Sequence, residues 1–111
     1  MKNLNEKVIA LTGAGSGIGR CLAIQLAQHG SHLSLSDVDE AGLKETKELL
    51  SQDIVVSTHI VDVADREQVY AWAENTIKDH GHVDCIINNA GVHPLQALKR
   101  LVMRILIGCL T

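Results

Sequence analysis

Apolar runs and helical stripes alternate along this chain. Four short runs, apolar throughout or on alternate positions, predict strands over residues 7–12, 31–36, 54–61 and 83–87. Between them, residues 17–29, 39–51 and 65–80 repeat apolar side chains at helical spacing. Strands that alternate with helices in this way predict an α/β fold, in which a parallel sheet carries helices on both faces.

A glycine-rich loop joins the first predicted strand to the first predicted helix, with the sequence TGAGSGIG over residues 12–19. Glycines in such a turn permit positive φ and let backbone N–H groups approach a ligand. The N-terminus of the helix that follows attracts an anion. Gly19, one step inside that helix, allows close packing against the sheet. The loop alone leaves a plain glycine-rich turn as the alternative.

Three more motifs follow the later strands in order. They are Asp37 after the second strand, Asp62-Val63 after the third, and Asn-Asn-Ala-Gly over residues 88–91 after the fourth. Together with the TGxxxGxG loop, these features resemble the short-chain dehydrogenase/reductase family from about residue 7 to residue 91. The resemblance implies a Rossmann-like parallel sheet that is truncated after the fourth strand.

The resemblance also implies that residues 1–91 form the NAD-binding half of that fold. In the family the matching positions surround the pyrophosphate and ribose, contact the adenine, or pass beneath the cofactor. The candidate cofactor-binding residues are Gly13, Ser16, Gly17, Ile18, Gly19, Asp37, Asp62, Val63, Asn89, Ala90 and Gly91. Two alternatives stay open: Asp62 as an ordinary turn residue, and Asn88 and Asn89 as braces between strand ends.

Asp37 predicts which cofactor the chain prefers. Its carboxylate can accept hydrogen bonds from both hydroxyls of the adenine ribose. It also opposes the 2′-phosphate of NADP, since two unit charges about 4 Å apart near a surface cost roughly 4 kcal/mol. The next residue is Val38 and not a cation, so NAD is the predicted cofactor. The alternative is that Asp37 caps the helix that begins near Asp39.

The catalytic residues of the family have no counterpart here. The resemblance implies a Tyr-x-x-x-Lys pair, a Ser and often an Asn, with the Lys lowering the pKa of the Tyr. Tyr70 is the only tyrosine, it precedes residues 88–91, and Arg66 and Glu74 stand four positions to either side. No catalytic residue is therefore assigned. The six histidines are predicted to be surface or cap residues, because none shares a metal-ligand spacing with the cysteines.

Residues 92–111 depart from the rest of the chain. No Asp or Glu occurs after Asp84, whereas Lys99, Arg100 and Arg104 all fall in this tail. One interpretation is an out-of-frame translation, because synonymous codons for residues 99–111 read in another frame give a string similar to the family's continuation. The other is a true amphipathic helix, since its apolar residues fall on one stripe.

Two functions follow from these interpretations. The first is a truncated NAD-dependent oxidoreductase of alcohols or carbonyls that keeps the adenine-dinucleotide half-site and is inactive alone, unless another chain supplies the active site. The second is a non-catalytic dinucleotide- or partner-binding module, completed by its C-terminal helix.

Charge and hydropathy narrow the classes of partner. A net charge of −3 on 111 residues argues against a nucleic-acid partner. No apolar run is long enough to span a membrane, and the N-terminus lacks the apolar core of a signal peptide. Three widely spaced cysteines predict buried thiols in a reducing compartment and no disulfide. We therefore expect a cytoplasmic protein, of unpredicted oligomeric state.

Overall fold

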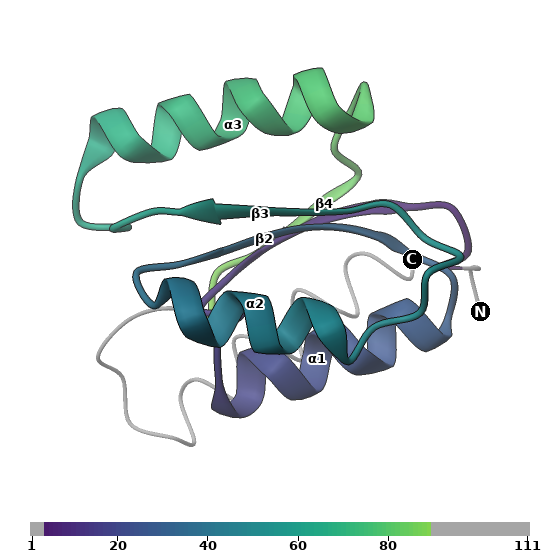
Figure 1. Cartoon of the computed structure of the whole chain (residues 1–111). Helices are drawn as coiled ribbons and strands as arrows, with labels where there is room; N and C mark the ends of the chain where they lie inside the picture. The colour runs from purple at the N-terminus through teal and green to yellow at the C-terminus, as the bar shows by residue number, and fades with distance from the viewer. Residues whose placement is uncertain (1–3, 90–111) are drawn as a thin grey trace.

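The computed structural model describes residues 4–89, and over this range the chain alternates strands with helices. The elements are β1 (Val8–Thr12), α1 (Gly17–Gln28), β2 (His32–Asp37), α2 (Glu40–Glu48), β3 (Val56–Ile60), α3 (Arg66–His80) and β4 (Cys85–Ile87). The strands form one sheet in the order β3-β2-β1-β4, and every neighbouring pair is parallel (Figure 1). The predicted α/β class and parallel sheet are confirmed.

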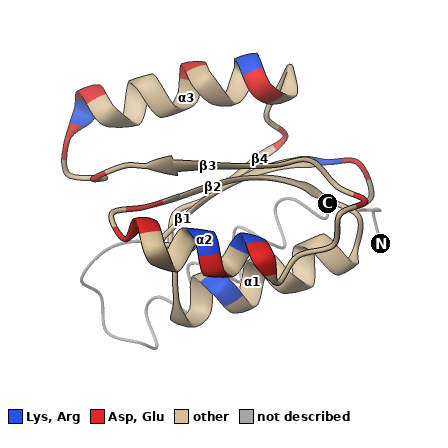
Figure 2. Ribbon diagram, viewed as in Figure 1, with Lys and Arg blue, Asp and Glu red and all other residues tan. Residues whose placement is uncertain are grey.

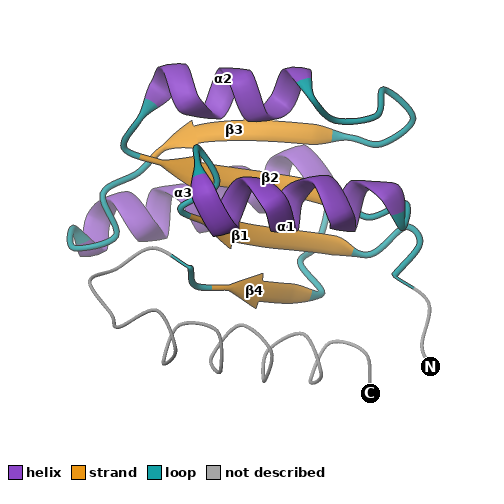
Figure 3. Cartoon of the chain, turned by 90° about the horizontal axis from the view of Figure 1, so that it is seen from below, coloured by secondary structure: helices purple, strands orange, loops and turns teal. Residues whose placement is uncertain are grey.

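The helices cover both faces of the sheet. Among residues 4–89, helices α1 and α2 lie side by side on one face, and α3 lies on the other (Figures 1 and 3). This arrangement follows from right-handed crossovers on either side of β1, where the strand order reverses. Charged residues sit on helices, turns and strand ends, whereas the body of the sheet carries none (Figure 2).

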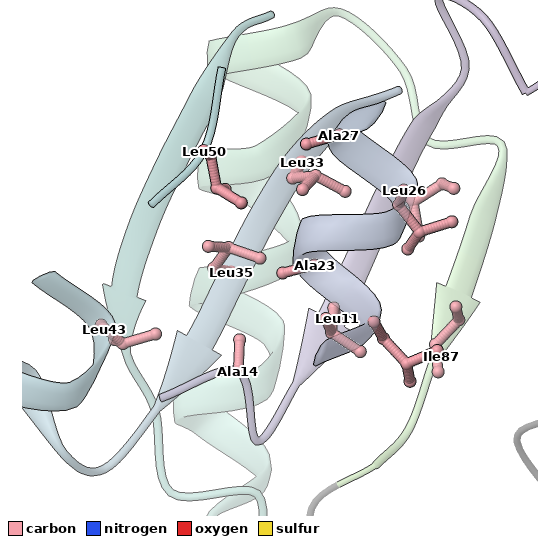
Figure 4. Packing of buried hydrophobic residues seen from close by; sticks show 12 residues of the cluster. Leu11, Ala14, Ala23, Leu26, Ala27, Leu33, Leu35, Leu43, Leu50 and Ile87 are labelled. Carbon is pink, nitrogen blue, oxygen red and sulfur yellow. The ribbon is translucent and has the colours of Figure 1, made fainter. Parts of the chain in front are cut away.

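The larger core lies between the sheet and the α1–α2 layer. All five residues of β1 are buried, because a central strand of a parallel sheet is covered on both faces. Figure 4 shows leucines and alanines of α1 and β2 interlocking with Leu11 of β1 and Ile87 of β4. This core holds α1, and with it the glycine-rich loop, against the sheet.

The smaller core lies between the sheet and α3. Its buried apolar residues are Ala10, Val61 and Trp72, with Val69 and Val83 packed against them. Hydrogen bonds supplement this contact, because the Trp72 indole donates to Ser34 Oγ at 2.8 Å and the Ser34 and Thr76 hydroxyls lie 2.8 Å apart. As the periodicity predicts, Trp72 belongs to the core, whereas the neighbouring Tyr70 is 63% exposed.

Several predicted boundaries and burial states are wrong. Helix α2 ends at Glu48, three residues early, and β4 begins at Cys85, two residues late. Asp84, just before β4, is joined to Val8 of β1 by two bonds: its carboxylate accepts the Val8 N–H and its own N–H donates to the Val8 carbonyl, each at 2.8 Å. Cys21 is exposed on α1, and Cys85 is half-buried and disulfide-bonded, so the prediction of buried thiols fails for both.

The histidine prediction also fails at one position. His59 of β3 points toward α3, where its side chain is only 17% exposed and its Nε2 lies 3.5 Å from Asp79 Oδ2. Burial lowers the pKa of His59, and it also lowers the pKa of His80, whose Nε2 lies 2.9 Å from Ser57 Oγ. Within residues 4–89 no helix has the length and apolar character needed to cross a membrane.

Candidate nucleotide-binding site

The predicted cofactor residues of the described range gather at one edge of the sheet. Because all four strands are parallel, their carboxyl ends meet there. Thr12 of β1 is level with Ser36 of β2, and Asp37 is level with Ile60 of β3. Motifs that lie far apart in the sequence are therefore neighbours in the fold. Ala90 and Gly91 lie outside the described residues.

The glycine-rich loop turns sharply at the end of β1. Gly13 has φ 65° and Gly17 has φ 57°, a region that residues with a Cβ rarely adopt. The Ala14 N–H donates to the Ser36 carbonyl at 3.0 Å, which ties the loop to β2. A Cβ at Gly19 would overlap the Gly13 carbonyl oxygen, so only glycine lets α1 begin this close to the strand, as the sequence predicts.

The N-terminus of α1 differs from those of the other two helices. Asp39 caps α2 by accepting the Gly42 N–H at 3.0 Å, and Asp65 caps α3 in the same way, with a Glu in the first turn of each helix. Ser16 is the N-cap residue of α1, yet its side chain makes no cap hydrogen bond, and the first turn holds no acidic residue. The positive end of the α1 dipole is therefore left open to an external anion.

Asp37 ends β2 and is held beside the glycine loop. Its Oδ2 accepts the Gly15 N–H at 2.8 Å, and its Oδ1 accepts the Asp39 N–H at 3.1 Å. The alternative that Asp37 caps α2 is wrong, because Asp39 is that cap. Two backbone donors thus fix the orientation of a half-buried carboxylate, and each oxygen keeps a further lone pair for a ligand hydroxyl.

At the end of β4, the two asparagines brace the sheet. Thr12 Oγ1 donates to Asn88 Oδ1 at 2.9 Å and accepts the Asn89 N–H at 2.8 Å, so β1 and β4 are joined through one hydroxyl. Asn89 Nδ2 donates to the Gly13 carbonyl at 3.3 Å. Asn89 Oδ1 is buried and has no hydrogen-bond partner among residues 4–89, which leaves an unsatisfied acceptor beside the loop.

Asp62 and Val63 form the start of the turn between β3 and α3. Asp62 Oδ1 accepts the Ala64 N–H at 2.9 Å, and the Asp62 N–H donates to Gln68 Oε1 at 2.8 Å. Asp62 is thus a turn residue in its local contacts, as the alternative interpretation held. The Val63 side chain is 38% exposed on the same edge as the glycine loop, where an aromatic ring could contact it.

One residue of the site escaped the sequence analysis. Arg20, in the first turn of α1, donates to the Gly15 carbonyl at 2.6 Å, to the Gly42 carbonyl at 3.1 Å and to Thr46 Oγ1 at 2.9 Å. Its one sequence signal is that it is the only charged residue of α1. A lone cation in a helix with buried neighbours indicates a specific acceptor, but the sequence does not show which one.

A cleft among the described residues lies elsewhere. It measures about 1130 Å³ and runs along the free edge of β3 between α2 and α3. None of the described cofactor-site candidates lines it. Nor do residues 4–89 contain a group of three His, Cys, Asp or Glu side chains placed to hold a metal ion. The motifs singled out in the sequence meet instead at the glycine-loop edge, which is the candidate site.

The strand order, with a glycine-rich turn after β1 and the crossover reversal beside it, defines a Rossmann-like fold. The sequence matches the family described as short chain dehydrogenase over residues 7–105, which extends past the motifs that carry the resemblance. The chain therefore belongs to the short-chain dehydrogenase family.

Individual relatives agree with this assignment. The chain is 40% identical over 88 residues to a probable oxidoreductase, EphD, of Mycobacterium tuberculosis, covering 78% of this chain and 15% of that protein. It is 39% identical over 94 residues to levodione reductase of Leifsonia aquatica, covering 82% of this chain and 35% of the reductase. The chain thus spans only 15% to 35% of the length of these curated relatives.

Solved structures agree with the Rossmann-like fold. The crystal structure of levodione reductase matches with a TM-score of 0.77 and 36% identity, over 91% of this chain and 43% of that one. A short-chain dehydrogenase/reductase of Burkholderia phymatum in complex with NAD matches with a TM-score of 0.78 and 30% identity, over 99% of this chain and 46% of that one.

Proposed function

We propose that the carboxyl edge of the sheet binds the adenosine-diphosphate half of NAD, in the manner of an oxidoreductase that acts on an alcohol or a carbonyl. The observation that carries the proposal is the open N-terminus of α1. It is the one helix of the described residues that lacks an acidic cap, and it follows the glycine-rich loop. The unsatisfied Asn89 Oδ1 beside that loop supports the same placement.

In this proposal the residues fit the cofactor as follows. The pyrophosphate lies at the α1 N-terminus, among backbone N–H groups of the loop and the first turn. The adenine ribose binds the Asp37 carboxylate, and Val63 and Asp62 border the adenine. Asn89, Ala90 and Gly91 pass beneath the cofactor. The residues assigned to the pyrophosphate and its ribose are Gly13, Ser16, Gly17, Ile18 and Gly19.

NAD rather than NADP is the proposed cofactor. The Asp37 carboxylate faces the site of the adenine ribose with both oxygens held by backbone donors. A 2′-phosphate would meet this charge directly.

Bound NAD would supply the hydride acceptor, and the described residues bind and orient its adenosine half. The sequence carries no Tyr-x-x-x-Lys pair, so we expect no turnover of alcohols or ketones by these 111 residues alone. The proposal assigns residues 1–91 to the NAD-binding half and sets residues 92–111 apart as a tail, the first part of which, to residue 105, still lies within the family match. Reading the gene across those codons in all three frames tests that division.

The binding proposal is tested by giving α1 the cap that α2 and α3 already have. Ser16→Asp places a carboxylate at the helix N-terminus, where it stabilises the helix and repels a pyrophosphate. We expect an unchanged or higher melting temperature together with NAD affinity at least about tenfold weaker by isothermal titration calorimetry. Ser16→Asn, a neutral cap of the same shape, is the matched control and should lose far less. Equal NAD affinity in the two variants would contradict the proposal, as would wild-type chain that binds no NAD.

A further inference from the structure

We infer that Arg20 is a positioning residue for the glycine loop, and that its guanidinium fork holds the Gly15 carbonyl, and with it the Gly15–Ser16 peptide, in the orientation that pyrophosphate binding requires. The inference rests on the proposed dinucleotide site. It adds a residue that lies behind the loop and is assigned no direct contact with the cofactor. Through Arg20, the loop is also hydrogen-bonded to α2.

Gly15 is held at both of its backbone polar groups, which belong to two successive peptide units. Its N–H donates to Asp37 Oδ2 at 2.8 Å, and its carbonyl accepts from Arg20 at 2.6 Å. A glycine has no side chain by which packing could anchor it, so these two bonds orient the two peptide planes that meet at its Cα, Ala14–Gly15 and Gly15–Ser16. Because Ser16 and Gly17 follow at once, the same bonds aim the N–H groups at the start of α1.

Arg20 is itself fixed by α2. One terminal nitrogen of its guanidinium bonds the carbonyls of both Gly15 and Gly42, and its Nε donates to Thr46 Oγ1 at 2.9 Å. Thr46 is fully buried, and its hydroxyl in turn donates to the Ala14 carbonyl at 2.8 Å. The Ala14 carbonyl therefore accepts from Thr46 and the Gly15 carbonyl from Arg20, so one hydrogen-bonded Arg–Thr pair holds two successive loop carbonyls.

The ion pair between Arg20 and Glu45 is not the interaction that holds the loop. Glu45 Oε2 lies 3.2 Å from the guanidinium, but its side chain is 67% exposed, whereas that of Arg20 is 26% exposed. A pair of this kind contributes little, because solvent screens it. The bonds to backbone carbonyls are the stronger candidates, since they join a charged donor to partly buried acceptors that would otherwise lose their partner.

The test compares ligands with and without the pyrophosphate. Wild type, Arg20→Met and Arg20→Lys are titrated with ADP and with adenosine, and binding is followed by NMR. We expect Arg20→Met to weaken ADP by about tenfold or more, while adenosine, held mainly by Asp37, changes by less than about twofold. Arg20→Lys keeps the charge but lacks the fork that spans Gly15 and Thr46, so its ADP affinity should fall between the two.

Two further variants separate positioning from general stability. Thr46→Val removes the second half of the Arg–Thr pair and should weaken ADP selectively, as Arg20→Met does. Glu45→Gln removes the exposed partner and should leave both ligands unchanged. The amide hydrogen exchange of Gly15 should speed up in the Arg20 and Thr46 variants and stay at the wild-type rate in Glu45→Gln.

The outcomes are distinguishable. Wild-type protein that binds neither ADP nor NAD overturns the proposed function, and this inference with it. Wild-type protein that binds ADP, with an Arg20→Lys variant of equal ADP affinity and equal Gly15 exchange, overturns the inference alone. Parallel losses of ADP and adenosine in every folded Arg20 variant would show a role in packing only. Should Arg20→Met fail to fold, Arg20→Lys and Thr46→Val decide the matter.

Discussion

The two faces of the sheet are held in different ways. On the α1–α2 face a continuous apolar cluster packs both helices against the strands. The glycine loop, Asp37 and Arg20 belong to the elements that this cluster holds together. On the α3 face the apolar cluster of the described residues is smaller, with Ala10, Val61 and Trp72 as its buried members, and hydroxyl and imidazole groups add hydrogen bonds to the contact. The comparison teaches that the candidate site is built on the face with the larger apolar core.

The largest expected effect comes from breaking the α1–α2 face. Leu35 is fully buried at the centre of that core, so Leu35→Ala should destabilise the chain by about 2–5 kcal/mol, from lost transfer energy and the cavity left behind. The matched control is Leu49→Ala, since Leu49 is 59% exposed and should change stability by less than about 0.5 kcal/mol. Urea unfolding followed by circular dichroism measures both, and similar midpoints would refute the assignment of this core.

A substitution on the α3 face should lower the free energy of unfolding by less, and the loss should come from hydrogen bonds. Ser34→Ala removes the partner of both the Trp72 indole and the Thr76 hydroxyl, which leaves a buried donor unsatisfied at a cost of about 1–3 kcal/mol. Trp72 fluorescence and urea unfolding report the change. Ser51→Ala, at an exposed turn, is the control. A Ser34→Ala chain as stable as wild type would mean that apolar contact alone holds α3.

Asp37 should affect cofactor choice far more than stability. We expect Asp37→Ala to narrow the preference for NAD over NADP by about tenfold or more, because the carboxylate that opposes the 2′-phosphate is gone. Asp53→Ala makes the same change of charge in an exposed loop at the opposite end of the strands and should leave the preference unaltered. Calorimetric titration of both cofactors measures this ratio. Wild-type protein with equal affinity for NAD and NADP would rule out the role given to Asp37.

The smallest expected effect is a loss of stability in mild acid on the α3 face. Burial lowers the pKa of His59 and of His80 below the ordinary value of 6.5, although Asp79 acts in the opposite direction on both. The unfolded chain therefore binds protons at a higher pH than the folded chain does. The stability that depends on neutral imidazoles is full above pH 6.5 and falls as the pH drops toward the folded pKa values.

The measurement compares urea midpoints between pH 7.5 and pH 5.5. His59→Gln should show a smaller loss than wild type, and the exposed His29→Gln should behave as wild type. The Val8 N–H bond lowers the pKa of Asp84, but that carboxylate titrates below this window and does not interfere. An unchanged pH dependence in His59→Gln would assign the acid sensitivity to other groups.

The sequence predicted the features that depend on residues close together along the chain. Alternating apolar runs located every strand, and the glycine spacing located the loop and the close approach at Gly19. It missed contacts between residues far apart in sequence. Arg20 meets partners 22 and 26 residues away, at Gly42 and Thr46, and no periodicity records such a pair. The same holds for His59, whose burial depends on how α3 crosses the sheet.

The site was predicted from motifs and not from energetics. Asp37 was placed correctly at the end of β2, but the sequence left open whether it or Asp39 caps α2, because both positions precede the helix. Which aspartate turns toward the helix depends on the Gly15 N–H, which draws the Asp37 carboxylate toward the loop.

The most direct test of the central claim is an NMR titration of ¹⁵N-labelled protein with ADP. The account predicts chemical-shift changes concentrated at Gly13, at Ser16 to Gly19 and at Asn89, with the cleft between α2 and α3 and the α3 face left undisturbed. Shifts centred on that cleft, or none at saturating ADP, would contradict the placement of a dinucleotide at the open end of α1.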